Sequence, residues 1–259
     1  MRKSLLSAAL LGLAGLAEAG VVVKNVPYEI DGQPFEGKLV YDDAISDPRP
    51  GLLMVPNWLG VTDASAEKAA RAAGDKYVVF VADMYGKSIR PSNADEAKQA
   101  ATTVRSDRAL MRKRAQAAVE VLKAQTSHVA LDTAKLGAIG FCFGGGTVLE
   151  LARSGAPLKA FVSFHGNLDT PNPADANNIK APVLVLHGAD DPAVPPAQVD
   201  GFEAEMKAAK VDWQLVSYGG AVHSFTDPLA NTPGSNQYHP LVAARAFKAM
   251  DNLLDEVFE

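Results

Sequence analysis

Short apolar runs alternate with amphipathic segments along most of this 259-residue chain. The runs with the length and composition of strands cover residues 51–55, 77–81, 135–139, 158–164, 183–187 and 213–218. The segments with helical apolar spacing cover residues 64–73, 94–125, 143–153, 196–207 and 241–257. Strands that alternate with crossover helices predict an α/β fold, with helices on both faces of a doubly wound, mostly parallel sheet.

The first strands and the longest helical segment have further features. Residues 21–26 and 35–41 predict two edge strands joined in a hairpin through Asp31 and Gly32. The helical segment 94–125 is expected to break near Ser106. Residues 227–238, rich in Asn, Pro and Gly, predict either a lid over the preceding histidine or a plain surface loop.

One turn in this pattern carries the strongest chemical signal. The sequence Gly140-Phe141-Cys142-Phe143-Gly144 joins a strand to a helix and has the form of a nucleophile elbow, with cysteine in the place of serine. Cys142 is the only cysteine in the chain. A thiol beside a helix N-terminus has a lowered pKa, which favours the nucleophilic thiolate. The alternative is a small buried apolar side chain, the usual state of a free cysteine.

Two later strands are followed by residues that favour the catalytic alternative. Asp190 and Asp191 come after residues 183–187, and His223 comes after residues 213–218. The order nucleophile, acid, histidine is the one found in α/β-hydrolases. The histidine would take the thiol proton and later protonate the leaving group, while the aspartate would orient the imidazole ring.

With these residues in this order, the chain resembles the dienelactone hydrolase family of α/β-hydrolases. The segments that carry the resemblance are 55–61, 82–86, 140–145, 187–195 and 219–225. The resemblance implies the α/β-hydrolase fold and hydrolysis of enol-lactones and related esters. It also implies the triad Cys142, Asp191 and His223. Asp191 is preferred to Asp190 because its loop then runs D-x-x-V-P, as is usual in this fold.

Further residues are expected to complete the site. The backbone N–H groups of Phe143 and Trp58 would form an oxyanion hole. Asn57, Tyr85 and Phe225 would line the substrate pocket, although aromatic residues near an elbow are as often ordinary core.

This chain departs from the best-known family members at two places. Asn57 stands where those members carry a glutamate that helps to activate the thiol, so the helix N-terminus and His223 would have to suffice. Those members also hold a carboxylate substrate with arginines. Here Asp227 follows the histidine, and the nearest cations after the strand 77–81 are Lys87 and Arg90.

Residues 1–19 have the features of a secretory signal. Arg2 and Lys3 form a basic region, residues 5–16 form an apolar stretch too short to span a bilayer, and Ala17-Glu18-Ala19 resembles a cleavage site. Residues 20–259 are then expected to form one hydrolase domain, periplasmic or secreted, without stable membrane association. The alternative is a buried or amphipathic N-terminal helix.

Charge and histidine spacing limit the expected partners. The formal net charge of −5 argues against nucleic acid, and the basic cluster 105–114 predicts a solvated helix face. The five histidines lack metal-ligand spacing, and His165 and His187 are expected to be structural, so neither a metal nor a cofactor is predicted. The expected partner is a small-molecule ester or lactone.

These observations together predict an exported ester or lactone hydrolase that works through a Cys–His–Asp triad and a thioacyl intermediate. The alternatives are a non-catalytic binding or thiol-sensing module on the same fold, and an acyltransferase. An acid–histidine pair argues against a mere binder, because a binder does not need one.

Overall fold

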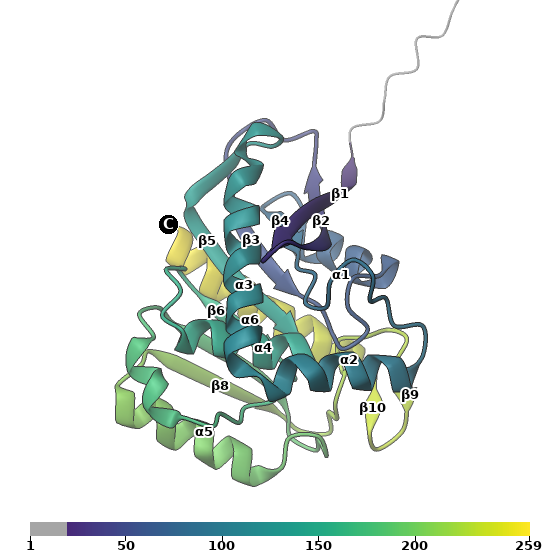
Figure 1. Ribbon diagram of the computed structural model, residues 1–259. Coiled ribbons are helices and arrows are strands. Elements are labelled where there is room, and N and C mark those ends of the chain that lie inside the picture. Colours follow the sequence, from purple (N-terminus) through teal and green to yellow (C-terminus); the bar gives the residue numbers. More distant parts are fainter. Residues whose placement is uncertain (1–19) are drawn as a thin grey trace, which may run out of the picture.

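An eight-stranded sheet forms the centre of the molecule (Figure 1). The three predicted triad residues follow the carboxyl ends of three of its parallel strands. The computed structural model describes residues 20–259, and the predicted secretory signal lies outside the described residues. The strands of the sheet are β1 (Val21–Ile30), β2 (Gln33–Asp42), β3 (Arg49–Val55), β4 (Val78–Val81), β5 (Leu131–Phe141), β6 (Phe161–Phe164), β7 (Val183–Gly188) and β8 (Trp213–Tyr218). Their order across the sheet is β1-β2-β4-β3-β5-β6-β7-β8.

The sheet is parallel from β4 to β8 and antiparallel at its first edge. β1 and β2 form the predicted hairpin, in which Asp31 and Gly32 both adopt a positive φ, of 52° and 73°. The prediction of two edge strands is wrong for β2. This strand pairs antiparallel with β4, so that Leu39 lies opposite Phe80 and only β1 remains at the edge.

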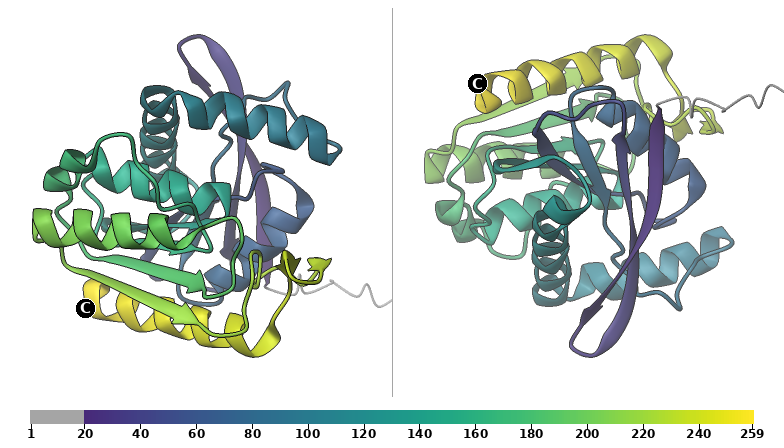
Figure 2. Two further views of the ribbon diagram at one scale, coloured as in Figure 1. Left: turned by 90° about the horizontal axis from the view of Figure 1, so that it is seen from below. Right: turned by 90° about the horizontal axis from the view of Figure 1, so that it is seen from above.

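Helices cover both faces of the sheet, as the alternating pattern predicts (Figure 2). The helices are α1 (Asp63–Ala73), α2 (Ala94–Ser106), α3 (Arg108–Lys123), α4 (Phe143–Arg153), α5 (Pro196–Ala209) and α6 (Pro240–Phe258). Side chains along a strand alternate between the faces. In β4, Val78 and Phe80 therefore pack with α3 and α4, whereas Val79 and Val81 pack with α1 and α6.

The helical segment after β4 breaks at Asp107, one residue beyond the predicted position. The Asp107 carboxylate accepts a hydrogen bond from the N–H of Leu110 at 2.9 Å and so begins α3. The prediction of a solvated basic face on α3 is wrong. Arg112 lies 2.8 Å from the buried carboxylate of Glu150 on α4, and Arg108 lies 3.0 Å from Asp169. The cationic face is therefore an ion-paired contact between helices and a loop.

Short elements complete the loops of the described chain. The 3₁₀ turns η1 (Ala124–Ser127) and η2 (Pro173–Asn178) precede β5 and β7, and the small strands β9 (Asn231–Thr232) and β10 (Asn236–Gln237) form a hairpin after β8. The N–H of Gln237 donates to the carbonyl of His223 at 3.1 Å, which attaches this hairpin to the histidine loop. Within residues 20–259, no helix is long and apolar enough to cross a membrane.

Candidate active site

The turn from β5 into α4 holds Cys142 in a strained backbone conformation. Its φ is 57° and its ψ is −119°, and its N–H donates to the carbonyl of Phe164 at 3.0 Å. The flanking glycines permit the close packing that this turn requires. A Cβ added at Gly140 would lie 2.1 Å from the carbonyl oxygen of Gly144, and one added at Gly144 would lie 2.0 Å from that of Val55. The turn therefore presents the thiol directly at the start of α4.

The loops after β7 and β8 bring an acid and a histidine together. His223 Nδ1 lies 2.7 Å from Asp191 Oδ2, and both side chains are buried. The other Asp191 oxygen accepts from the N–H of Ala193 at 2.8 Å, which fixes the carboxylate. Asp190 instead accepts from the N–H of Gly220 at 3.0 Å. The structure thus places Asp191, and not its neighbour, against the imidazole.

Cys142 and His223 shift each other's protonation. Burial opposes the thiolate, but the hydrogen bond and the positive charge of His223, with two backbone N–H groups, outweigh it and lower the pKa of Cys142. Burial also opposes the imidazolium, yet the hydrogen bonds to Asp191 and Cys142 and the negative charges of both raise the pKa of His223 to about 10. Each group stabilises the charged form of the other, so the contact shifts the pair toward thiolate and imidazolium.

The two backbone N–H groups that lower the pKa of Cys142 are those of Phe143 and Trp58. Phe143 belongs to the first turn of α4, and Trp58 belongs to the loop after β3. Tyr85 holds this loop in place, because its hydroxyl donates to the carbonyl of Trp58 at 2.8 Å. The side chain of Asn57 accepts from the N–H of Leu59 at 3.0 Å and so shapes the same loop. Both predicted oxyanion donors therefore converge on the thiol.

Two other buried histidines lie near this centre. His165 is buried, its ring stands edge-on to that of His223 at 5.2 Å, and its Nε2 lies 2.8 Å from the hydroxyl of Thr226. Burial, with the positive charge of His223, holds the pKa of His165 well below its usual value, so it stays neutral. His187 is buried at the end of β7. The Nδ1 atoms of both rings are buried without a hydrogen-bond partner among residues 20–259, so the structural role expected for these histidines stays a prediction.

A cavity of about 460 Å³ opens beside the predicted oxyanion loop. Asn57 and Trp58 form part of its wall, and Ser224, the residue after His223, forms another part. The residues that enclose it come from α1, from the loop after β3 and from residues 224–236. Phe225 does not line it, because this ring has no exposed surface and packs against His165 and Tyr218. The structure therefore places Asn57, but not Phe225, at the cavity.

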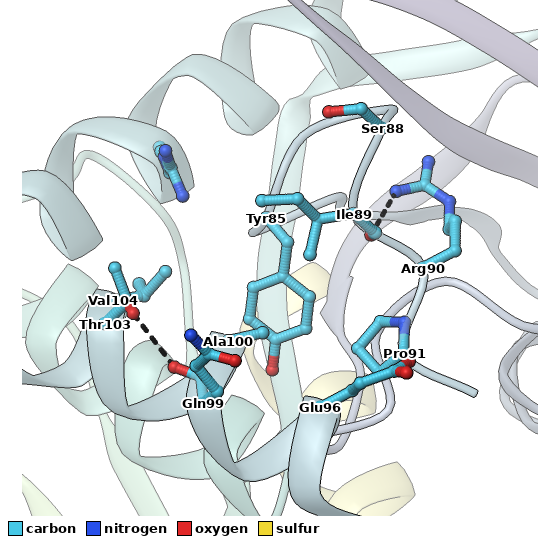
Figure 3. Close-up of a pocket in the computed structure, with 11 residues that line it drawn as sticks. Tyr85, Ser88, Ile89, Arg90, Pro91, Glu96, Gln99, Ala100, Thr103 and Val104 are labelled. Carbon is cyan, nitrogen blue, oxygen red and sulfur yellow. Dashed lines mark hydrogen bonds between the residues drawn. The ribbon is translucent and has the colours of Figure 1, made fainter. Parts of the chain in front are cut away.

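Tyr85 lines a second cavity, of about 420 Å³, between the loop after β4 and helix α2. Figure 3 shows Tyr85 and Ile89 on one side of it and Gln99 and Thr103 of α2 on the other. Burial and the Cys142 charge raise the pKa of Tyr85, so the phenol remains protonated and can donate to Trp58. The tyrosine thus separates this cavity from the oxyanion loop.

One cation beside the site comes from α1, an element that the sequence pattern did not connect with the site. Arg90 is bound to Asp83 at 3.0 Å, and Lys87 is bound to Glu36 at 3.0 Å. Lys68 of α1 instead lines the 460 Å³ cavity, with its ammonium 4.7 Å from the centre of the Phe141 ring. The sequence of this amphipathic helix does not indicate that Lys68 reaches the cavity, because that placement depends on tertiary packing.

The protonation of the pair leads to a prediction for Asp191→Asn. Loss of the carboxylate removes the hydrogen bond and charge that raise the pKa of His223, so the imidazolium loses its proton at lower pH. The thiolate then loses its cationic partner, and the pKa of Cys142 rises. The pH dependence of Cys142 alkylation by iodoacetamide should therefore shift to higher pH. Asp190→Asn is the matched control, and an equal shift in both variants would contradict the assignment of Asp191.

Comparisons with known proteins agree with this architecture. The model of the dienelactone hydrolase family matches residues 35–258, a range that includes Cys142, Asp191 and His223. A solved structure of a dienelactone hydrolase-like promiscuous phosphotriesterase from metagenomic libraries is 41% identical, with a TM-score of 0.86, over 93% of this chain and 100% of that one. An uncharacterized protein of Caenorhabditis elegans is 38% identical over 57% of this chain and 94% of its own length. A Methylorubrum extorquens protein assigned as a carboxymethylenebutenolidase is 31% identical over 69% of this chain and 64% of its own.

Proposed function

Since this chain belongs to the dienelactone hydrolase family and is an enzyme of ester or lactone hydrolysis, we propose that Cys142 is its nucleophile. In this proposal His223 carries the proton and Asp191 orients the histidine. The observation that carries the proposal is that the elements holding Cys142, His223 and Asp191 bring these residues together. His223 and two backbone N–H groups lower the pKa of the thiol at the turn into α4, and the histidine is bound to Asp191 at 2.7 Å.

Acylation begins from the thiolate–imidazolium pair. The Cys142 thiolate attacks the carbonyl carbon and forms a carbon–sulfur bond, and the carbonyl π electrons move to the oxygen. The N–H groups of Phe143 and Trp58 donate to this oxyanion. When the intermediate collapses, the bond to the leaving oxygen breaks, and the His223 imidazolium gives its proton to that oxygen. The enzyme is left as a thioester with a neutral imidazole.

Deacylation reverses these roles with water. Neutral His223 takes a proton from a water molecule, and the hydroxide attacks the thioester carbon within the same oxyanion hole. The carbon–sulfur bond breaks, the acid product leaves, and the thiolate–imidazolium pair forms again. Asp191 holds the ring in one orientation throughout and stabilises its charged form. No glutamate at position 57 is needed, because His223 and the N–H groups already stabilise the thiolate.

The proposal is tested with purified residues 20–259 and a panel of p-nitrophenyl esters, small lactones and one phosphotriester. The phosphotriester is included because the 41%-identical relative carries that activity in its name. We expect turnover of at least one ester or lactone. While that substrate is present, alkylation of Cys142 by iodoacetamide should be suppressed. Failure to turn over any member of the panel would contradict the proposal and favour the thiol-sensing alternative.

Product analysis separates hydrolysis from acyl transfer. With an added alcohol or amine, a hydrolase should yield mainly the free acid, because water remains the acceptor. A dominant ester or amide product would instead identify an acyltransferase. Both reactions use the same thioester, so this measurement leaves the role of Cys142 unchanged.

We also propose that the protein is exported and that residues 1–19 are removed as a signal. The support is the basic start, the short apolar stretch and the Ala17-Glu18-Ala19 sequence. Protein recovered from the periplasm or medium of a secreting host should begin at Gly20 by N-terminal sequencing. Recovery of full-length chain from the cytosol alone would contradict export.

A further inference from the structure

Lys68 is a cation on the wall of the 460 Å³ cavity, and the proposed reaction does not use it. Its side chain is only 12% exposed. The ammonium lies over the ring of Phe141, the residue before Cys142, and 3.9 Å from the nearest oxygen of Asp227. Among residues 20–259, this is its only carboxylate neighbour within 4.0 Å, and the distance is too long for a hydrogen bond.

A largely buried ammonium that makes no hydrogen bond within residues 20–259 is energetically unfavourable. A lysine head group is strongly hydrated in water, and burial without hydrogen-bonding partners removes that hydration. The contact with the face of Phe141 and the attraction of Asp227 compensate only part of this loss. Burial lowers the pKa of Lys68, and the charges of Asp227 and Cys142 oppose this shift. An anion in the cavity would supply the missing acceptor.

The other charges around the cavity limit the kind of anion. Asp227 and Glu67 line the wall, the Cys142 thiolate lies nearby, and Arg71 is the second cation. A dianion would meet repulsion from three negative groups against two cations. A monoanion such as a carboxylate needs only to replace Asp227 as the partner of Lys68. Arg71, which is exposed, attracts such a group to the cavity without filling it.

We propose that Lys68 forms a subsite for a monoanionic group, such as a carboxylate, on the ester or lactone that Cys142 attacks. The proposal rests on the proposed function. The cavity wall includes Trp58 of the oxyanion loop and Ser224 of the histidine loop, but neither Cys142 nor His223, so the anionic group would occupy the cavity while the ester carbonyl extends past Trp58 to the thiol. The anion is then recognised from α1, and not from the loop that carries the ion-paired Lys87 and Arg90.

The test compares two substrates with the same leaving group, p-nitrophenyl acetate and mono-p-nitrophenyl succinate. The readout is the ratio of kcat/KM for the anionic ester to kcat/KM for the neutral ester. We expect Lys68→Met to lower this ratio at least tenfold and Lys68→Arg to keep most of it. Lys207→Met, on α5 outside the cavity, is the matched control and should leave it unchanged. A ratio within twofold of wild type in Lys68→Met would overturn the proposal.

Asp227→Asn distinguishes recognition of the substrate anion by Lys68 from a purely structural ion pair between α1 and the loop that carries Asp227. This variant removes the competing charge but keeps the oxygen that accepts from the N–H of Leu229 at 3.0 Å. If Lys68 binds the substrate anion, the ratio should rise severalfold. If the ion pair merely fastens the loop, Asp227→Asn should lower the ratio as Lys68→Met does, and that result would overturn the subsite.

Alkylation of Cys142 tests the subsite without ester turnover. The rate with anionic iodoacetate, divided by the rate with neutral iodoacetamide, should fall in Lys68→Met and stay constant in Lys207→Met. If no ester is hydrolysed but this quotient falls, the proposed function fails and the subsite stands. If esters are hydrolysed and neither ratio changes in Lys68→Met, the subsite fails and the proposed function stands.

Discussion

Cys142→Ala should lower kcat/KM for p-nitrophenyl acetate by about 10⁴-fold, a loss of about 5.5 kcal/mol of transition-state stabilisation. The variant removes the atom that forms the carbon–sulfur bond, and with it the thiolate whose formation His223 favours. His223 and the N–H groups of Phe143 and Trp58 stay in position, so a small residual rate from water attack is expected. The measurement is steady-state hydrolysis by residues 20–259 of the variant beside the wild type.

Two controls make this result specific for the thiol. The melting temperature of Cys142→Ala should stay close to that of the wild type, because the substitution removes only one atom from a partly exposed side chain. Cys142→Ser keeps a hydroxyl at the site but not a group that ionises near neutral pH, and it should also be strongly impaired. Hydrolysis by Cys142→Ala at a rate near that of the wild type would exclude this residue as the nucleophile.

Gly144→Ala should lower the free energy of unfolding by at least about 3 kcal/mol. The new Cβ would lie 2.0 Å from the carbonyl oxygen of Val55 and 2.5 Å from that of Pro56. Both are backbone atoms, so neither can rotate away as a flexible side chain does. For a domain of this size, the loss corresponds to a melting temperature lower by about 6–12 °C, measured by thermal unfolding. Because Pro56 leads into the oxyanion loop, the same displacement should move the N–H of Trp58 and lower activity.

Gly201→Ala is the matched control, since Gly201 also lies within a helix. A Cβ at this position in α5 has no atom within 4 Å, and alanine is the better helix former. This variant should gain about 0.5–1 kcal/mol of stability and keep its activity. Equal stability of Gly144→Ala and Gly201→Ala would contradict the tight packing between the elbow and the end of β3.

The parts of the fold that the sequence predicted are those that local pattern determines. The strand 213–218 and the helix 143–153 have the predicted bounds, because an alternation of apolar and polar residues and a glycine-rich turn define them without help from other segments. The course of β5 differs, since it begins at Leu131 and not near residue 135. The additional residues pair with Arg49 and Pro50 across a bulge, which is a contact between distant segments.

The same distinction applies to the site. The meeting of Cys142, Asp191 and His223 could be predicted, because each residue follows the carboxyl end of a parallel strand of the same sheet. Lys68 could not be predicted, since its role depends on how α1 packs beside the loop that carries Asp227. The buried state of Phe225 was equally hidden, because the sequence does not reveal which side of the histidine loop faces the core.

Acid-quenched mass spectrometry during turnover tests the central claim most directly. An ester with a bulky acyl group, such as p-nitrophenyl pivalate, slows the attack of water and lets the covalent intermediate accumulate. If Cys142 is the nucleophile, one acyl group per chain should be carried as a thioester on the tryptic peptide that contains Cys142. An acyl group on any other side chain, or a Cys142 that stays unmodified while the ester is consumed, would contradict it.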